Sequence, residues 1–420
     1  MSLLPVGITA DDLTGAADTA AAFADLRRPV PVSLLGAPRA HEGRNAFAVT
    51  TESRSCSPDD AYALSHASVR ALMESGARLI YKKVDSNLRG NVGAELAAAR
   101  DAAAVPVILA PAFPARRRTT VGGVVLVAGT PVAETEMAAD PEAPVRHSEV
   151  GEIIHSQRED LLVAHCPLSV VREGAAAIAS QARTDAVLVV DAETEADLEV
   201  IARAGLSLSP TPVLAGSAGL AAALARVLFG PPAPTSWPEG RAGPVLGVLA
   251  SSSQAMASQL SRAALDVDTA AVPLPCQGLT RRDEPLPELA SAIAQAKKGL
   301  DPGHDTLVYA VGPLPEVESP VELVVEHLAH LAFVLVRLSS PVGLLIGGGA
   351  TASGVLAALG AEAVEVDDEP LPGIAGGTIV GGEMDGRPVV LKPGAAGDEE
   401  AVLRLLRYLG RRAAALEGAG

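Results

Sequence analysis

Aromatic residues are the scarcest large side chains in this sequence. They make up 2% of its 420 residues, whereas hydrophobic residues as a whole make up 48%. The hydrophobic cores must therefore be built mainly from alanine, valine and leucine. A chain of this length is typical of two domains.

Cysteine and positive charge are also in short supply. The three cysteines, Cys56, Cys166 and Cys276, are far apart and odd in number, which excludes a disulfide framework and a CxxC metal site and favours a reducing compartment. The formal net charge of −17 argues against a nucleic-acid or anionic-membrane partner. An anionic ligand would have to be bound where the few lysines and arginines gather in a cleft.

Long hydrophobic runs are missing as well. The longest ones, such as residues 331–336 and 342–346, are too short to span a bilayer. The start of the sequence lacks the basic region and the long apolar core of a secretory signal. We therefore expect a soluble cytoplasmic protein.

Short Val/Ile/Leu runs alternate with alanine-rich helical segments along the whole chain. In the first half we expect strands at 3–8, 46–49, 79–84, 105–110, 186–190 and 212–215, and helices at 20–26, 61–75, 93–103, 174–183 and 219–228. In the second half we expect strands at 245–250, 270–274, 306–311 and 342–346, and helices at 254–265, 286–298, 321–331, 352–359 and 399–409. This order predicts the α/β class: two α/β domains with mostly parallel sheets and helices on both faces.

Proline and turn residues mark the boundaries. Five prolines fall within residues 229–244, a stretch that cannot continue a helix or a central strand. We expect a linker at 233–244 between a first domain, 1–232, and a second, 245–420. Asp385-Gly386 predicts a hairpin near the end of the chain, and residues 124–134 predict a smaller one.

The first chemically informative stretch joins the first strand to the first helix. It carries Asp11, Asp12, Thr14, Gly15 and Asp18, at the place where open α/β sheets bind ligands. Thr14 is expected to cap the helix, and Gly15 to allow a tight turn. Capping alone explains one aspartate. Three carboxylates together favour a polyhydroxylated substrate or a metal ion.

A second charged stretch follows the strand at 79–84 and leads into a helix. It contains Lys82, Lys83, Asp85, Ser86, Arg89 and Gly90. Arginine binds carboxylate or phosphate in a bidentate manner and lysine adds a point charge, so the stretch is suited to an acidic substrate. Arg54, after the strand at 46–49, is a candidate for the same anion; taken alone, its position is more typical of a surface salt bridge. A third basic loop has Arg116, Arg117 and Arg118 in succession, which cannot all face one ligand.

The second domain has three loops that resemble phosphate-binding turns. Each stands between a strand and a helix, where backbone amides can cradle an anion. The residues are Ser251 and Ser253; Gly347, Gly348, Gly349, Ala350 and Thr351; and Lys392, Gly394 and Gly397. They match neither a Walker A motif nor GxGxxG. Each loop singly is more typical of a packing turn, but three in one domain favour nucleotide binding. The loop at 216–219 of the first domain is a weaker case. His327 and His330 lack metal-site spacing and are expected on the surface.

Together these motifs resemble the four-carbon acid sugar kinase family, the kinases of threonate, erythronate and 3-oxo-tetronate. The resemblance rests on the motifs in their order along nearly the whole chain: Asp11 to Asp18, Lys83 to Gly90, 111–114 with Arg118, 216–220 and the late glycine loops. It implies an N-terminal domain that binds the sugar acid, a C-terminal domain that binds ATP and an active site in the cleft between them. The reaction implied is transfer of the γ-phosphoryl group to the terminal hydroxyl of the acid.

The resemblance also implies roles for individual residues. Lys83, Arg54 and Arg89 would bind the substrate carboxylate and hydroxyls, and Asp11, Asp12 or Asp85 would accept the hydroxyl proton, with Asp12 preferred. The catalytic set is thus Asp12, Asp85 and Lys83, and the substrate-binding set is Asp11, Thr14, Asp18, Arg54, Ser86, Arg89 and Gly90. The three late loops would hold ATP, with Mg²⁺ bridging its phosphates. A homodimer is expected from how common two-fold assemblies are.

One departure from the family pattern bears on activity. The family usually has Gly-Gly-Asp-Thr where this chain has Gly348-Gly349-Ala350-Thr351, so a carboxylate is absent; Asp367 or Asp368 is a candidate to replace it. Two other interpretations therefore stay open. The chain is a catalytically degenerate ATP-binding paralogue with a regulatory or scaffold role, or it is a different α/β enzyme of sugar acids, such as an aldolase or dehydrogenase, without ATP affinity.

Overall fold

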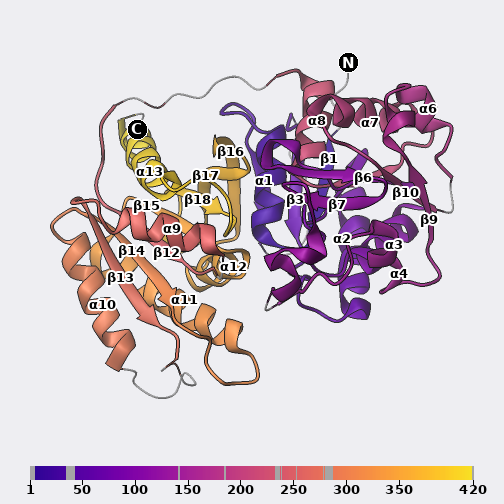
Figure 1. Ribbon diagram of the computed structural model, residues 1–420. Helices are drawn as coiled ribbons and strands as arrows, with labels where there is room; N and C mark the ends of the chain where they lie inside the picture. Colours follow the sequence, from indigo (N-terminus) through magenta and orange to yellow (C-terminus); the bar gives the residue numbers. More distant parts are fainter. Residues whose placement is uncertain are drawn as a thin grey trace. The chain divides into compact units, whose positions relative to one another are not determined.

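The computed structural model describes residues 5–34, 43–140, 142–183, 186–231, 237, 239–251, 253–277, 279 and 287–418. The chain divides into two compact units, Met1–Ala233 (unit 1) and Pro234–Gly420 (unit 2) (Figure 1). Residues 233–236 and 238 of the predicted linker, and Ser252 of the serine loop, lie outside the described residues. Among the helices described, none combines the length and the apolar content needed to cross a membrane.

Unit 1 is built on a parallel sheet with the strand order β2-β3-β1-β4-β11-β5-β10-β9. The strands are β1 Val6–Ala10, β2 Val30–Ser33, β3 Ala46–Thr50, β4 Leu79–Lys83, β5 Val107–Ala110, β9 Leu162–Cys166, β10 Ala186–Val190 and β11 Val213–Gly216. Strands such as β10, with the sequence AVLVV, are buried along their whole length. This is expected of parallel strands that are covered on both faces.

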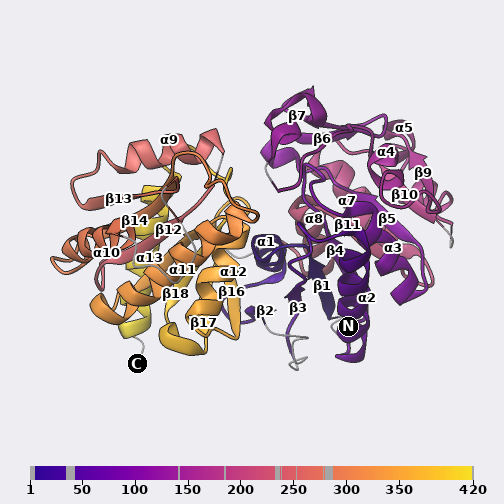
Figure 2. The ribbon, with the colours of Figure 1, turned by 90° about the horizontal axis from the view of Figure 1, so that it is seen from below.

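Helices cover both faces of this sheet, as predicted. α1 Leu13–Phe23 and α8 Ala218–Phe229 pack together, with α7 Glu195–Ser207 beside α8. α2 Pro58–Glu74, α3 Val92–Ala103 and α4 Val150–His155 form a second group, in which α2 and α3 lie side by side (Figure 2). The short helices α5 Leu168–Val171 and α6 Ala175–Ala179 follow β9. α7 begins with a capping box formed by Thr194 and Asp197.

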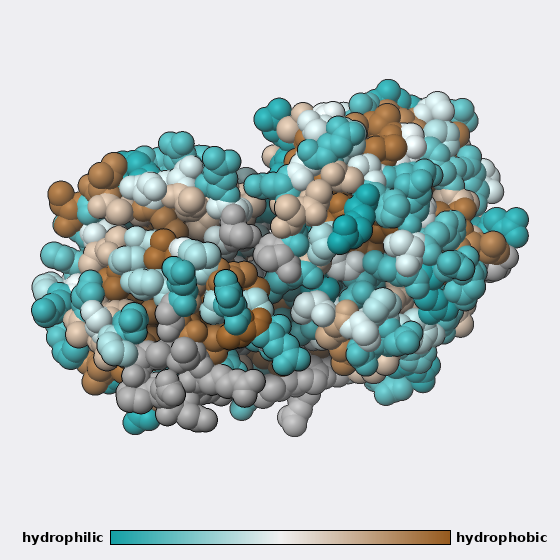
Figure 3. Space-filling model, turned by 60° about the horizontal axis from the view of Figure 1, so that its bottom comes forward, coloured by the Kyte–Doolittle hydropathy of each residue, from teal (hydrophilic) through white to brown (hydrophobic). Residues whose placement is uncertain are grey.

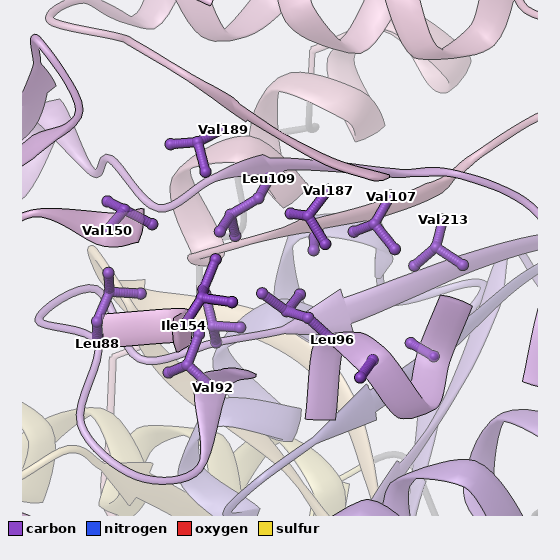
Figure 4. Packing of buried hydrophobic residues seen from close by; sticks show 14 of the residues in the cluster. Leu88, Val92, Leu96, Val107, Leu109, Val150, Ile154, Val187, Val189 and Val213 are labelled. Carbon is purple, nitrogen blue, oxygen red and sulfur yellow. The ribbon is translucent and has the colours of Figure 1, made fainter. Parts of the chain in front are cut away.

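The hydrophobic core between the sheet and the second helix group is mainly aliphatic, with Phe47 as its one fully buried aromatic side chain among the described residues. Leu88, Val92 and Leu96 pack against Val107, Leu109, Val187, Val189 and Val213 of the strands and Ile154 of α4 (Figure 4). The shortage of aromatic residues is thus met by close packing of branched side chains, as the composition predicted. Because the core fixes β4 and α3, it also fixes the turn between them, which carries Asp85 and Arg89.

A small antiparallel sheet projects from unit 1 after β5. It consists of β6 Arg118–Val121, β7 Val124–Val127 and β8 Thr130–Pro131, with the 3-10 helices η1 Pro114–Arg116, η2 Val132–Glu134 and η3 Glu136–Ala139 around it. The buried carboxylate of Asp191, after β10, accepts hydrogen bonds from Gly122 N (2.8 Å) and Gly123 N (3.0 Å) in the β6–β7 turn. These bonds tie the small sheet to the main one.

Unit 2 has the strand order β13-β14-β12-β15-β18-β17-β16. The strands are β12 Val245–Leu249, β13 Thr269–Pro275, β14 Asp305–Val311, β15 Gly343–Gly347, β16 Ala363–Leu371, β17 Ile374–Val380 and β18 Pro388–Lys392. The first five in spatial order are parallel, and β17 is antiparallel to both β18 and β16. The helices are α9 Gln254–Ala263, α10 Pro287–Leu300, α11 Pro320–Ser339, α12 Gly349–Ala358 and α13 Ala401–Gly418, with η4 Gly382–Met384.

The structure confirms most of the predicted elements and corrects several. The Asp385-Gly386 turn does connect two antiparallel strands, β17 and β18. The predicted helix at 174–183 is only α6, residues 132–134 form η2 instead of a strand, and β2, β9, β16 and α7 were not predicted. His327 was expected on the surface but is buried, because α11 turns that side toward the interior, whereas His330 is exposed.

Hydrophilic side chains dominate the described surface on the face shown in Figure 3, and hydrophobic ones lie between them in small groups. Single large hydrophobic residues such as Leu265 and Val267 are well exposed. Isolated apolar residues of this kind are normal on a protein surface. The buried polar groups at the strand ends are, by contrast, unusual for a protein interior.

Candidate active site

The turn from β1 into α1 places three carboxylates at the edge of the unit 1 sheet. Asp12 caps α1 in place of Thr14, because Asp12 has extended backbone dihedrals while Thr14 already lies inside the helix. Asp12 Oδ1 accepts a hydrogen bond from Gly15 N (2.7 Å), and Thr14 Oγ1 donates to Asp12 Oδ2 (2.9 Å). The prediction of Thr14 as the cap was thus wrong by two positions. Its hydroxyl orients the aspartate that does the capping.

Arg54 joins Asp11 and Asp12 from the loop after β3. Its Nε lies 2.7 Å from Asp11 Oδ2, and its Nη1 lies 2.7 Å from Asp12 Oδ2. Burial alone would raise the pKa of Asp12, but the charges of Arg54 and Lys83 outweigh burial and lower it. Gly90 lies against this arginine with φ +86°, and a Cβ there would lie 3.2 Å from Arg54 Cγ. Glycine at 90 is required by both the backbone angle and this approach.

The two lysines of β4 do not converge on one ligand. Successive side chains of a strand point to opposite faces. Lys82 Nζ therefore reaches Glu95 on α3 (2.8 Å), while Lys83 Nζ lies 3.7 Å from Asp18 Oδ1 on α1. Both side chains are buried. Lys83, the lysine assigned to the site from the sequence, is thus the one that belongs to the carboxylate cluster.

Gly15 allows Lys83 to approach the start of α1. A Cβ at this position would lie 2.9 Å from Lys83 Nζ and 2.5 Å from Asp12 Oδ1. Any larger residue would push the ammonium group away from the helix. The glycine is thus required by a close approach of the side chains that carry charge.

Asp18 lies one helical turn after Thr14 and faces Lys83. Burial raises the pKa of this carboxyl to about 6, although Lys83 and Arg116 act to lower it. Asp12 and Asp18 therefore lie on the same side of the turn with pKa values shifted in opposite directions. Pairs of this kind are characteristic of active sites.

The turn after β4 is held by an arginine–carboxylate pair. Arg89 binds Asp85 through Nε (3.0 Å) and Nη2 (3.2 Å), and its Nη1 lies 3.1 Å from Asp140. Burial raises the pKa of Asp85, but the charges of Arg89 and Arg54 lower it well below its usual range. Ser86 is half-buried between these groups. The turn is rigid and its charges largely compensate one another.

Three further residues reach this cluster that the sequence did not assign to the site. Arg118 at the start of β6 donates from Nε to Asn87 Oδ1 (3.3 Å), and Asp140 contacts Arg89 from the segment after η3. Arg118 was singled out as part of a basic loop, but nothing in the sequence indicated its partner. Asp140 carries no local signal, since it is 51 positions from Arg89.

The three predicted loops of unit 2 do come together. Ala250 N donates to Gly347 O (2.9 Å), and Gly348 N donates to Lys392 O (3.0 Å). Gly348 has φ +103°, and a Cβ there would lie 2.4 Å from Ala250 O; a Cβ at Gly394 would lie 2.4 Å from Ser251 Oγ. The parallel strands β12, β15 and β18 end at the same edge, which is why their loops meet.

Side chains around these loops hold the backbone in place. Ser253 caps α9 through Met256 N, and Ser251 Oγ donates to Ser253 Oγ (3.0 Å). The buried Lys392 donates to Gly394 O (3.0 Å). Gln259 Nε2 donates to Gly397 O (3.0 Å), where the backbone has φ +86°. At this edge of the sheet, a ligand would therefore meet mainly backbone groups of the loops, together with the first turn of α12.

Ala350 is exposed in that first turn, whereas Thr351 beside it is buried. Asp367 and Asp368 do not take the place of the missing carboxylate. They lie on β16, which is separated from β15 by β18 and β17, so they are roughly 14 Å away at the usual strand spacing. Asp367 is bound by Arg412 (2.6 and 2.8 Å), and Asp368 accepts from Trp237 and Tyr408.

Within the described ranges, no three His, Cys, Asp or Glu side chains are grouped so that they could hold a metal ion. The described residues therefore offer no all-protein cage for Mg²⁺.

Comparison with known proteins relates both units to one family. Residues 6–224 match the model of a sugar-binding N-terminal domain, and residues 246–402 match that of a nucleotide-binding C-terminal domain. The two matches cover the carboxylate cluster of unit 1 and the three loops of unit 2.

Relatives with assigned activities extend over nearly the whole chain. A D-threonate kinase from Bordetella bronchiseptica is 36% identical over 420 residues, which cover 97% of this chain and 98% of that protein. A D-erythronate kinase from Heliobacterium modesticaldum is 31% identical over 436 residues, which cover 96% and 97%.

Solved structures share the fold. A crystal structure from Salmonella typhimurium LT2 has a TM-score of 0.76 at 20% identity and covers 97% of this chain and 100% of its own. One from Haemophilus influenzae has a TM-score of 0.68 at 21% identity and covers 95% and 98%. With the family models and the full-length relatives, the resemblance expected from the motifs is confirmed: the chain belongs to the four-carbon acid sugar kinase family.

Proposed function

We propose that this protein is an ATP-dependent kinase that phosphorylates the terminal hydroxyl of a four-carbon sugar acid, a tetronate or 3-oxo-tetronate. The observation that carries the proposal is the combination of two strand-end sites in one chain. Unit 1 has a cluster of buried carboxylates and cations, and unit 2 has three converging loops, one rich in serine and two rich in glycine. The names of the relatives support the same reaction.

The cations of unit 1 suit the acid substrate. Lys83 Nζ makes no hydrogen bond within the described part of the chain, and its nearest carboxylate oxygen is 3.7 Å away. Among the same residues, Nη2 of Arg54 also lacks a partner. These donors are available to the substrate carboxylate and hydroxyls, whereas Arg89 has all three nitrogens engaged and serves to fix Asp85.

The remaining polar groups define the rest of the acid site. In this proposal Asp12, Asp85 and Lys83 form the charged centre of the acid site, the substrate contacts Asp11, Thr14, Asp18, Arg54, Ser86 and Gly90, and Arg89 acts through Asp85. Phosphoryl transfer depends on positioning and on charge compensation. A cluster that is preorganised can therefore favour the reaction. Its charged side chains are held by partners before any substrate arrives.

The loops of unit 2 suit the phosphates of ATP. A serine turn precedes α9 and a glycine turn precedes α12, and the backbone N–H groups at such helix N-termini favour anions. The proposed ATP contacts are Ser251, Ser253, Gly347, Gly348, Gly349, Ala350, Thr351, Lys392, Gly394 and Gly397. Mg²⁺ enters as an ion carried by the ATP phosphates, because it is typically bound through substrate phosphates and water.

Ala350 supports a second candidate function, an ATP-binding protein with impaired catalysis and a regulatory or scaffold role. An exposed alanine stands where the family usually has an aspartate. This candidate differs from the first in one respect that can be measured: it binds ATP but forms no phosphorylated product.

The test is ATP consumption by the full chain with Mg²⁺ and a panel of D- and L-threonate, D- and L-erythronate and their 3-oxo forms. We expect ADP release that depends on one of these acids, with a phosphomonoester of the acid seen by ³¹P NMR. ATP binding without turnover on any of them would contradict the kinase and favour the degenerate protein. No ATP binding at all would contradict both. The homodimer and the cytoplasmic location expected from the sequence stay predictions.

A further inference from the structure

The carboxylates of the unit 1 cluster differ in how many of their oxygens already accept hydrogen bonds from the protein. Asp12 Oδ1 accepts from Gly15 N, and its Oδ2 accepts from both Thr14 and Arg54. Asp85 has both oxygens bound by Arg89. A carboxylate with both oxygens bound by strong donors is a poor proton acceptor, because each donor stabilises the ionised form.

Asp11 has one oxygen that accepts a hydrogen bond and one that is buried. Its Oδ2 is bound by Arg54, and its Oδ1 is enclosed by protein with no hydrogen-bond partner in the described residues. An oxygen sealed in this way cannot reach the hydroxyl of a substrate. Asp11, Asp12 and Asp85, the three acids considered for proton transfer from the sequence, are therefore each unsuited to it in the geometry observed.

Asp18 is the exception. Its Oδ1 receives only a long hydrogen bond from Thr19 Oγ1 (3.2 Å) and lies 3.7 Å from Lys83 Nζ. Its Oδ2 has no hydrogen-bond partner among the described residues and, unlike Asp11 Oδ1, is not sealed off, since the side chain keeps 8% exposure. Asp18 thus offers a free oxygen in the same cluster as the substrate-binding cations.

The groups that face Asp18 come from three elements, β4, η1 and α1 itself. Lys83 and Tyr81 face it from β4, Arg116 from η1, Asp12 from the start of α1 and Thr19 from its own helix. Burial exceeds the lowering effect of the two cations, and the pKa of Asp18 is raised to about 6. A group with a pKa near the working pH accepts a proton more effectively than an ordinary carboxylate.

We propose that Asp18 is the catalytic base of this kinase, and that its Oδ2 takes the proton of the substrate's terminal hydroxyl. The inference rests on the proposed function. In the step, the hydroxyl O–H bond breaks and the proton binds Asp18 Oδ2. The hydroxyl oxygen forms a bond to the γ-phosphorus of ATP, the bond from that phosphorus to the β,γ-bridging oxygen breaks, and ADP leaves. The proton then passes to solvent, so Asp18 is regenerated.

In this step the neighbouring residues Lys83 and Asp12 have different roles. Lys83, close to both Asp12 and Asp18, keeps the cluster near charge balance while a proton enters it. Asp12 acts as a positioning residue: it orients Arg54 and begins α1, which carries Asp18.

The test compares Asp18→Asn with wild type under saturating ATP and acid. An amide keeps the shape and the Thr19 contact but cannot take the proton. We expect kcat to fall about 10²–10⁴-fold, with the dissociation constant of the acid, measured by calorimetry, changed less than about threefold. Wild-type kcat should fall below about pH 6, since Asp18 must be ionised, and this acidic limb should be lost in the variant.

Three variants serve as controls. Asp160→Asn makes the same chemical change at an exposed site and should match wild type. Asp18→Glu keeps a proton acceptor and should recover part of the lost rate, which decides the matter if Asp18→Asn does not fold. Asp12→Asn still caps α1 but loses charge opposite Arg54, so it should weaken acid binding and keep the acidic limb.

The outcomes separate the inference from the function on which it rests. Wild-type turnover together with an Asp18→Asn variant that keeps its rate and its acidic limb would overturn the base and leave the kinase standing. If the acidic limb of the kcat profile were lost in Asp12→Asn but not in Asp18→Asn, the catalytic base would be Asp12. A wild-type protein without turnover on any acid would remove the kinase, and the base with it.

Discussion

The two candidate sites lie at equivalent places, the carboxyl ends of parallel strands, but they are built from different material. The site in unit 1 consists of charged side chains that hold one another, such as Arg54 between Asp11 and Asp12. The site in unit 2 consists of backbone, and its one buried lysine, Lys392, is turned toward the carbonyl groups of its own loop. A small acid with several hydroxyls needs directed side chains, whereas a polyphosphate is well served by N–H groups.

The largest effect is expected when the charge balance of unit 1 is broken. Lys83→Met removes the ammonium group but keeps much of the stem, and it leaves Asp12 and Asp18 without their shared cation. We expect kcat/KM for the acid to fall about 100-fold or more, with the KM for ATP little changed. Steady-state kinetics with each substrate varied in turn would measure this. Lys298→Met, at an exposed position of α10, is the matched control.

In unit 2 the corresponding prediction concerns a substitution that disturbs the backbone of a loop. Gly348→Ala introduces a Cβ 2.4 Å from Ala250 O at a φ of +103°, so the turn must shift. We expect the KM for ATP to rise about tenfold or more, a change of roughly 1.4 kcal/mol, with acid binding unchanged. Gly303→Ala carries a similar backbone strain, φ +94°, without any neighbour within 4 Å. If both variants lose ATP affinity equally, crowding at the loop is not the cause.

A smaller effect is expected from restoring the family's carboxylate. Ala350→Asp places an acid at an exposed position in the first turn of α12, where negative charge is also favourable to the helix. In an active kinase we expect kcat to change by no more than about tenfold, roughly 1.4 kcal/mol. A coupled ADP assay would measure it. A rate that rises from zero would instead identify the wild type as the degenerate protein.

The smallest kinetic effect is expected at the second polar cluster of unit 2. Tyr408→Phe removes the bond to Asp368 (2.9 Å) and the contact with Arg412 (3.0 Å). We expect a loss of about 1–2 kcal/mol in the free energy of unfolding and unchanged KM for ATP. Chemical denaturation with parallel kinetics would show whether this cluster is structural. A changed KM would assign it to the nucleotide site.

The sequence indicated the alternating strands, the strand-end motifs and the family because these depend on local patterns. It misassigned contacts that depend on three-dimensional register. Whether Lys82 or Lys83 faces α1 follows from the phase of β4, and Asp140 reaches Arg89 only through the fold of the segment after η3. The sequence suggested Asp11, Asp12 or Asp85 as the base and gave Asp18 only a substrate-binding role. It did not show that Gly15 and Thr14 bind both oxygens of Asp12.

The edge strand β16 is a second example of contacts that could not be predicted from the sequence. Its sequence, AVEVDDEPL, alternates polar and apolar residues only in part and has shifts in register against β17. Asp367 and Asp368 therefore looked available to a ligand, whereas Arg412, Trp237 and Tyr408 from distant positions bind them. Such long-range pairs leave no local trace in one sequence.

The most direct test of the division between the two units is calorimetric titration of Lys83→Met and Gly348→Ala with each ligand separately, using the acid identified by the turnover panel and ATP. The account predicts that Lys83→Met loses affinity for the acid and keeps that for ATP, and that Gly348→Ala does the reverse. If Lys83→Met lost ATP and kept the acid, or if Gly348→Ala lost the acid and kept ATP, the assignment of the acid to unit 1 and of ATP to unit 2 would be contradicted.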